Sequence, residues 1–192
     1  MPYFDINIVI IGIRSEKMKN ITVKKLTMGA IIAALYTALT LIVAPISFGP
    51  VQLRLSEAMT VLPAICPPAT VGLTLGCFIS NIFGFILGAN PLGLIDALVG
   101  TTATFLAALM TAYIGKKCRG AALYLLAPLP PVLLNALFVG AELCIVVIGD
   151  TSVPTLLATC LYVGLGEAIA CYLGGSALLK GSYKYFTDVF KK

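Results

Sequence analysis

Long apolar segments, each nearly free of charged side chains, constrain this chain more than any other feature of its sequence. Of its 192 residues, 59% are hydrophobic and only 11% are charged. A bilayer core about 30 Å thick is crossed by about 20 apolar residues in a helix that rises about 1.5 Å per residue. Segments of this length recur along the chain, so the sequence predicts an all-α integral membrane protein.

Six transmembrane helices are expected. Four spans are clear, at residues 26–44, 69–88, 92–115 and 154–179. A shorter one, residues 50–66, begins at Pro50, which suits a first helical turn. The remaining segment, residues 121–148, is the fifth span in chain order, and it is long and carries three prolines, at 128, 130 and 131. These should kink it, or divide it into an interfacial piece and a span that starts near Pro131.

Basic residues determine the predicted orientation, because Lys and Arg in short loops are retained on the cytoplasmic side. With six spans, both termini are predicted to be cytoplasmic, and 12 of the 13 Lys and Arg residues then lie on that side. Arg54 is the exception, since it falls at the outer end of the second span. The net charge of +5 mostly reflects these basic residues on the cytoplasmic side, and no nucleic-acid partner is expected.

Residues 1–17 are interpreted as an amino-terminal extension of a single six-helix membrane domain at residues 18–192. Their apolar stretch, INIVIIGI, has eight residues and is too short to cross a bilayer. It also lacks the basic start and the cleavage site of a signal peptide. The extension could lie in the membrane interface, or translation could begin at Met18, which is the favoured interpretation.

Polar side chains inside the predicted spans mark a candidate ligand site. A charge at mid-bilayer costs about 2.5–3.5 kcal/mol on the lenient insertion scale, so such groups should face the protein interior or water. Arg54 and Glu57 are three residues apart and can pair on one helix face. The candidate site residues are Gln52, Arg54, Glu57, Asn81, Asp96, Asn135 and Glu142. Pairs that merely hold the bundle together would leave a similar pattern, but the carboxylates outnumber the one cation, which favours a ligand site.

Ala30, Ala34 and Ala38 recur every four residues, which aligns them on one helix face that another backbone can approach closely. From spacing alone, this alanine face could serve packing within the bundle or contact with a partner.

Glu167 is set apart from the other polar residues, past the middle of the last span toward the cytoplasm. It is flanked by Gly164 and Gly166. An internal hydrogen bond or an interface with a partner is favoured here over ligand binding.

Catalytic and metal-binding patterns are not found in the sequence. There is no histidine, no phosphate-binding G-x-x-x-x-G-K-[ST] loop, and no serine or cysteine beside a base. The six cysteines contain no C-x-x-C pair. We therefore expect no enzyme activity, no metal site and no cofactor in this chain.

The stretches ISFGPVQLRLSEAMTVLP and NIFGFILGANPLGLIDALVGTTAT resemble the QueT family. Its members are queuosine-precursor transporters, the substrate-binding S components of energy-coupling factor (ECF) transporters. The likeness covers residues 18 to about 180. It implies a six-helix S-component bundle in the bacterial cell membrane and a pocket open to the outside. It also implies that the alanine face docks on a transmembrane coupling protein, and that two partner ATPase subunits use the ATP.

The resemblance further suggests what the polar residues bind. A 7-deazaguanine presents adjacent N–H donors, which a carboxylate can accept, and a ring carbonyl that a cation or amide can meet. Glu57 or Asp96 suits the first role, and Arg54, Gln52 or Asn81 the second. Glu142 would suit the ammonium of an aminomethyl base. An S component for another vitamin and a stand-alone carrier would be served equally well by such a pocket, and a membrane enzyme is the least favoured interpretation.

Overall fold

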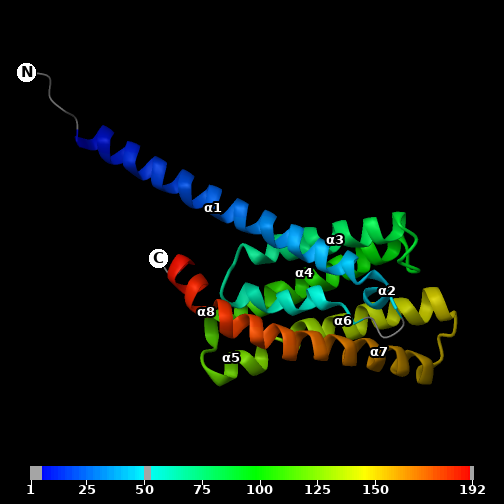
Figure 1. The fold of residues 1–192 in the computed structure, drawn as a ribbon. Helices are drawn as coiled ribbons and strands as arrows, with labels where there is room; N and C mark the ends of the chain where they lie inside the picture. Colours follow the sequence, from blue (N-terminus) through cyan, green and yellow to red (C-terminus); the bar gives the residue numbers. More distant parts are fainter. Residues whose placement is uncertain (1–5, 50–52, 191–192) are drawn as a thin grey trace, which may run out of the picture.

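A computed structural model describes the backbone of residues 6–49 and 53–190, and the side chains of residues 23–49, 53–186 and 188. Within these residues the regular elements are all helical. Five segments are long and apolar enough to cross a membrane: Val23–Ile42, Ala69–Ile86, Leu94–Lys117, Ala121–Ile148 and Val153–Phe186. They pack side by side into an elongated bundle, and α1 projects from one end of it (Figure 1).

The close packing of α1 (Ile6–Ile42) against α3 (Ala69–Ile86) depends on glycines. A Cβ atom on Gly72 would lie 2.5 Å from the carbonyl oxygen of Gly29, and one on Gly76 would lie 2.8 Å from the Cβ of Tyr36. Only residues without a side chain allow the two backbones to approach this closely. The polar side of α1, which carries Tyr36 and Thr40, is thereby fixed toward the protein interior, where both residues are fully buried.

The alanine face lies elsewhere on α1. Ala30, Ala34 and Ala38 are all exposed, whereas Gly29 and Ala33 of the same helix are buried. Packing within the bundle therefore does not account for the alanine series in the isolated chain.

The predicted helical span at residues 50–66 is not confirmed. After α2 (Ala44–Ser47), and beyond residues 50–52, which lie outside the described chain, the structure has a 3₁₀-helix, η1 (Leu55–Ala64), of ten residues. It packs among α1, α4 and η3, and most of its side chains are buried. A backbone enclosed by protein does not need a lipid-facing helix of membrane length, which explains why this segment differs from the prediction.

The direction of the chain makes η1 a return pass. In Figure 1, α1 ends at one end of the bundle and α3 begins at the other, and η1 connects them through the interior. A 3₁₀-helix rises about 2.0 Å per residue, so this short element covers about 20 Å.

The remaining helices follow the predicted segments with shifted boundaries. They are α4 (Leu94–Lys117), α5 (Ala121–Leu126), α6 (Leu129–Glu142), η2 (Leu143–Ile148), α7 (Val153–Ala168), η3 (Ile169–Gly175) and α8 (Ser176–Phe190). The prolines divide residues 121–148 as expected, although α6 begins at Leu129 rather than near Pro131. Both η2 and η3 are π-helical turns, and through η3 the last span continues to Phe190.

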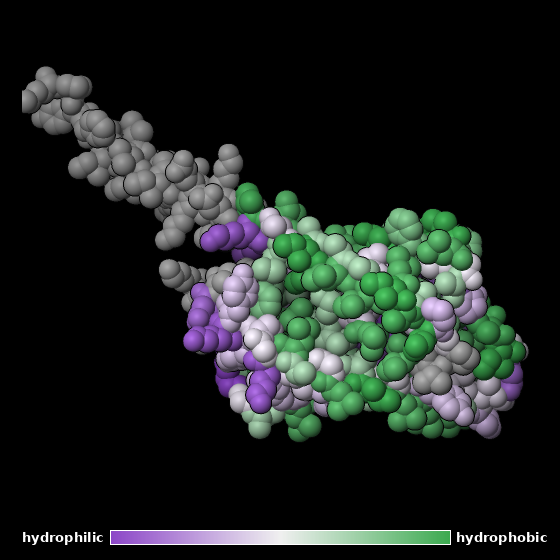
Figure 2. Space-filling model, viewed as in Figure 1, coloured by the Kyte–Doolittle hydropathy of each residue, from purple (hydrophilic) through white to green (hydrophobic). Residues whose placement is uncertain are grey.

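The surface separates lipid-facing flanks from a charged end. Large apolar side chains are exposed along the spans, and in Figure 2 they form a broad green flank. Hydrophilic residues gather at the end of the bundle from which α1 projects. The exposed basic residues in the described part of the chain are Lys24, Lys25, Lys116, Lys117, Arg119, Lys180 and Lys184. This distribution is typical of a multi-pass membrane protein.

The α1–α3 contact generates a stability prediction. Gly76→Ala should destabilise the protein by about 1–3 kcal/mol, because the added methyl group overpacks the contact with Tyr36. Gly181→Ala is the matched control, since Gly181 lies in α8 and a methyl group added there would meet no atom within 4 Å. Thermal unfolding in detergent should show a lower midpoint for Gly76→Ala only. Equal midpoints for the two variants would contradict the close packing.

Candidate functional site

A buried ion pair lies at the centre of the polar residues. Arg54 is 4% exposed, and its Nη2 lies 3.2 Å from Oδ2 of the fully buried Asp96. Its guanidinium carbon also lies 5.2 Å from the centre of the Phe48 ring. The predicted pairing of Arg54 with Glu57 is therefore wrong. Arg54 has extended backbone angles and precedes the first turn of η1, so the helical spacing assumed for that pair does not apply.

Asp96 is held from three directions. Its Oδ2 accepts hydrogen bonds from Arg54 and from Nδ2 of Asn90, the latter 2.8 Å long. Its backbone carbonyl accepts a 2.8 Å hydrogen bond from Nδ2 of Asn81. Asp96 lies in the first turn of α4, where a helix favours negative charge. Asn90 was not predicted from the sequence, where its only signal is an asparagine in the α3–α4 turn.

Glu57 is held by a tyrosine of α1. Glu57 is 1% exposed, and its Oε1 accepts a hydrogen bond from the Tyr36 hydroxyl. A second link between the same two elements joins Thr40 Oγ1 and Ser56 Oγ, which are 2.6 Å apart. Tyr36 was not predicted from the sequence either. The only available signal was a tyrosine in the middle of an apolar span.

Three further polar side chains of α6 and α7 complete the interior cluster. Asn135 is 3% exposed, Glu142 is 5% exposed and Glu167 is 3% exposed. Glu167 Oε2 accepts a hydrogen bond from the Cys171 thiol, 3.7 Å away, so of the two interpretations favoured for this residue the internal hydrogen bond is confirmed. Gln52 lies outside the described residues.

Several buried atoms of this cluster have no hydrogen-bond partner within the described chain. They are Glu57 Oε2, Asn81 Oδ1, Asp96 Oδ1, Asn135 Nδ2, and Glu142 Oε1 and Oε2. Buried polar atoms are nearly always paired, and each unpaired one costs about 1–3 kcal/mol. Five of the six atoms are oxygen acceptors, so the cluster suits a polar ligand that is rich in N–H donors.

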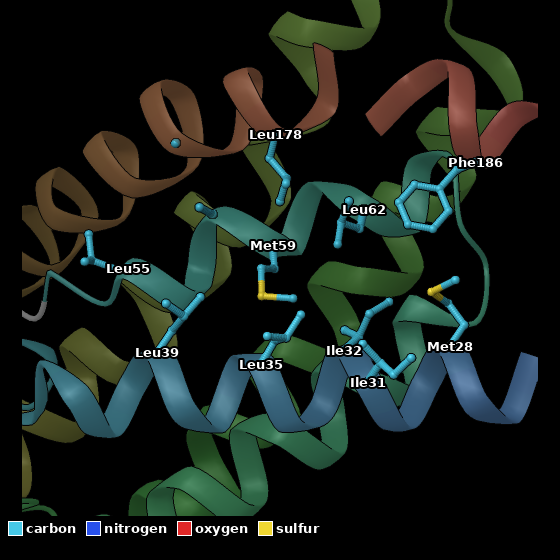
Figure 3. Close-up of a pocket in the computed structure, with 12 residues that line it drawn as sticks. Met28, Ile31, Ile32, Leu35, Leu39, Leu55, Met59, Leu62, Leu178 and Phe186 are labelled. Carbon is cyan, nitrogen blue, oxygen red and sulfur yellow. The ribbon is translucent and has the colours of Figure 1, made fainter. Parts of the chain in front are cut away.

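The molecule has an apolar hollow away from the polar cluster. It has a volume of about 460 Å³ and lies between α1, η1 and α8. Figure 3 shows Leu35 of α1 and Met59 of η1 pointing into it, with Leu178 of α8 on the far side. Its lining residues offer no polar side chain, so the polar cluster is the better candidate for recognising a polar ligand.

Apolar helices of membrane length around a buried and partly unpaired polar cluster are typical of a multi-pass membrane protein with a polar site in its interior. The chain belongs to the QueT transporter family, whose family model matches residues 26–184. A stretch of 77 residues is 35% identical to the queuosine precursor transporter QueT of Lactococcus lactis subsp. cremoris (strain MG1363). That stretch covers 39% of this chain and 41% of the relative. No solved structure matches the chain significantly.

Removing one member of the buried ion pair should destabilise the fold. Asp96→Asn leaves the Arg54 charge buried without its counter-ion, which typically costs about 3–5 kcal/mol. The exposed Asp188 provides the control Asp188→Asn, which should unfold like the original protein. Detergent-solubilised Asp96→Asn should therefore show a markedly lower thermal midpoint.

A double variant makes this prediction specific to the pair. Arg54→Met combined with Asp96→Asn should be more stable than Asp96→Asn alone, because no buried charge is then left unpaired. If the second substitution lowers stability further, the two side chains do not depend on each other for charge balance.

Proposed function

We propose that this protein is the substrate-binding S component of an ECF-type importer, and that it captures a queuosine precursor outside the cell. The unpaired acceptor atoms of the buried cluster carry the proposal, because they match a ligand with several N–H donors. Membership of the QueT transporter family and the name of the L. lactis relative support the choice of cargo. The chain itself performs no catalysis in this proposal.

The unpaired atoms suggest a revised set of ligand contacts. A deazaguanine edge offers two adjacent N–H donors, and Glu142 alone among the buried carboxylates of the described chain has both oxygens unpaired. Glu142 therefore suits the paired donors better than Glu57 or Asp96, each of which has one oxygen engaged. The ring carbonyl is met by the remaining N–H groups of Arg54. The side-chain oxygen of Asn81, Oδ1, accepts a hydrogen bond from a further N–H group of the ligand.

The proposed topology places the cluster toward the outer surface of the bacterial cytoplasmic membrane. It has six crossings, of which η1 is the short second one, and both termini lie in the cytoplasm. The exposed basic residues at one end of the bundle support this orientation, because such residues are retained inside. The ligand would then enter near the α3–α4 turn.

Energy would come from partner proteins. The exposed alanine face of α1, Ala30, Ala34 and Ala38, docks on a transmembrane coupling protein, which connects the S component to two ATPase subunits. Small side chains on an exposed transmembrane face permit the close helix approach that such docking needs.

Ligand binding tests the proposed site. Glu142→Gln replaces one of the two carboxylate oxygens, which accept hydrogen bonds from the ligand in this proposal, with an NH2 donor. A charge-assisted hydrogen bond of this kind contributes about 1.5–3 kcal/mol. The affinity for 7-aminomethyl-7-deazaguanine should therefore fall about 10- to 150-fold in titration calorimetry. Thr102→Val is the control, since Thr102 lies in α4 and bonds only the Leu98 carbonyl oxygen. Adenine, which lacks the donor pair, should bind weakly to the original protein. Unchanged affinity in well-folded Glu142→Gln would remove this residue from the site.

Docking is tested separately from binding. Ala34→Trp should abolish co-purification with the coupling protein and uptake into cells, because the indole prevents close helix approach. Ligand binding by the isolated variant should remain. Leu161→Trp is the control at an exposed position of α7, where Leu161 is 66% exposed, and it should assemble normally. Assembly and uptake by Ala34→Trp would contradict docking through this face and favour a stand-alone carrier.

A further inference from the structure

The buried charges of the described residues do not balance. Four carboxylates, Glu57, Asp96, Glu142 and Glu167, are at most 5% exposed, and Arg54 is the one buried cation in this part of the chain. Arg54 is already paired with Asp96. Buried charges are costly unless they are paired, so an additional positive charge would stabilise this interior.

The excess is concentrated at the deeper end of the cluster, around Glu57 and Glu167. The Cys171 thiol lies beside both residues, with Sγ 3.4 Å from the Glu57 carbonyl oxygen and 3.7 Å from Glu167 Oε2. The Asn135 amide lies beside both carboxylates as well. These contacts place two carboxylates from η1 and α7 around one amide of α6 in the protein interior.

Arg54 is the one buried basic residue of the described chain near these two carboxylates, and it is already paired with Asp96. The segments that carry Glu57, Asn135 and Glu167, at 55–64, 129–142 and 153–175, contain no Lys or Arg. Tyr36 donates to Glu57 Oε1 and the Cys171 thiol to Glu167 Oε2, but Glu57 Oε2 has no partner within the described chain, although Glu57 is only 1% exposed. Glu57 Oε2 lacks a donor, and the excess of carboxylates around it favours a donor that also carries positive charge.

We infer that Glu57, Asn135 and Glu167 form a subsite for a protonated primary amine on the ligand. An ammonium group supplies three donors and one positive charge, which matches two facing carboxylates. The inference rests on the proposed function and specifies its substrate as a cationic deazaguanine. Glu142 and Arg54 hold the base at one end of the cluster, and the amine extends to the deeper end. Glu167 thereby becomes a residue that determines specificity.

The first test compares two ligands on the unmodified protein. Purified protein is titrated with 7-aminomethyl-7-deazaguanine, which carries the amine, and with 7-cyano-7-deazaguanine, which is uncharged. We expect the aminomethyl base to bind at least about 10-fold more tightly, the lower limit for one charge-assisted hydrogen bond. Equal affinities, or tighter binding of the cyano base, would overturn the subsite and leave the proposed function standing. Binding of neither base would overturn both.

The second test assigns the preference to Glu167. In Glu167→Gln the ratio of the two affinities should fall about 10-fold or more toward unity, because a carboxylate partner of the amine is lost. Glu142→Gln should weaken both ligands and leave their ratio unchanged. Thr159→Val, on the same helix as Glu167, is the control, since Thr159 bonds only the backbone of α7. A well-folded Glu167→Gln with the original ratio would overturn the role of Glu167. If that variant does not fold, the comparison of the two ligands on unmodified protein still decides the inference.

Discussion

The ion pair of Arg54 and Asp96 is the interaction on which the arrangement of the interior depends. A guanidinium inside an apolar bundle needs a counter-ion, because the cost of its desolvation is otherwise uncompensated. By pairing with Asp96, Arg54 ties the start of η1 to the first turn of α4. Asn81 and Asn90 bond the same aspartate from α3 and from the α3–α4 turn. One pair of charges thus fixes three consecutive parts of the chain around the polar cluster.

The rest of the cluster is only partly satisfied, which relates stability to ligand binding. Unpaired atoms on Glu57, Asn135 and Glu142 lower the stability of the empty protein. A ligand that pairs them binds the folded state and not the unfolded chain, so it raises the apparent stability in proportion to its concentration and affinity. An interior of this kind is less stable than a fully apolar core of the same size. In the proposed function, the bound queuosine precursor supplies the missing hydrogen-bond partners.

The sequence predicted the membrane helices well because their signal is local. The length of the hydrophobic segments located four spans, and most of the predicted ends lie within a few residues of the observed ones. The proline cluster correctly divided the span at residues 121–148. Pairing inside the bundle could not be predicted in the same way. Spacing suggested Glu57 as the partner of Arg54, but the partner is Asp96, 42 residues away. Tyr36 and Asn90 were not identified, because a single tyrosine or asparagine carries no periodic signal.

The winding of η1 has a consequence for what this segment can tolerate. A 3₁₀-helix has about three residues per turn, so side chains three residues apart lie in one row along the helix. Glu57, Thr60 and Pro63 form such a row on the buried side of η1. An α-helix of the same residues would be about 15 Å long instead of about 20 Å and would turn each third side chain about 60° out of line. A single inserted or deleted residue would likewise rotate everything beyond it by about 120°. This segment can therefore exchange side chains, but it cannot change its length without moving this row of side chains away from its buried neighbours.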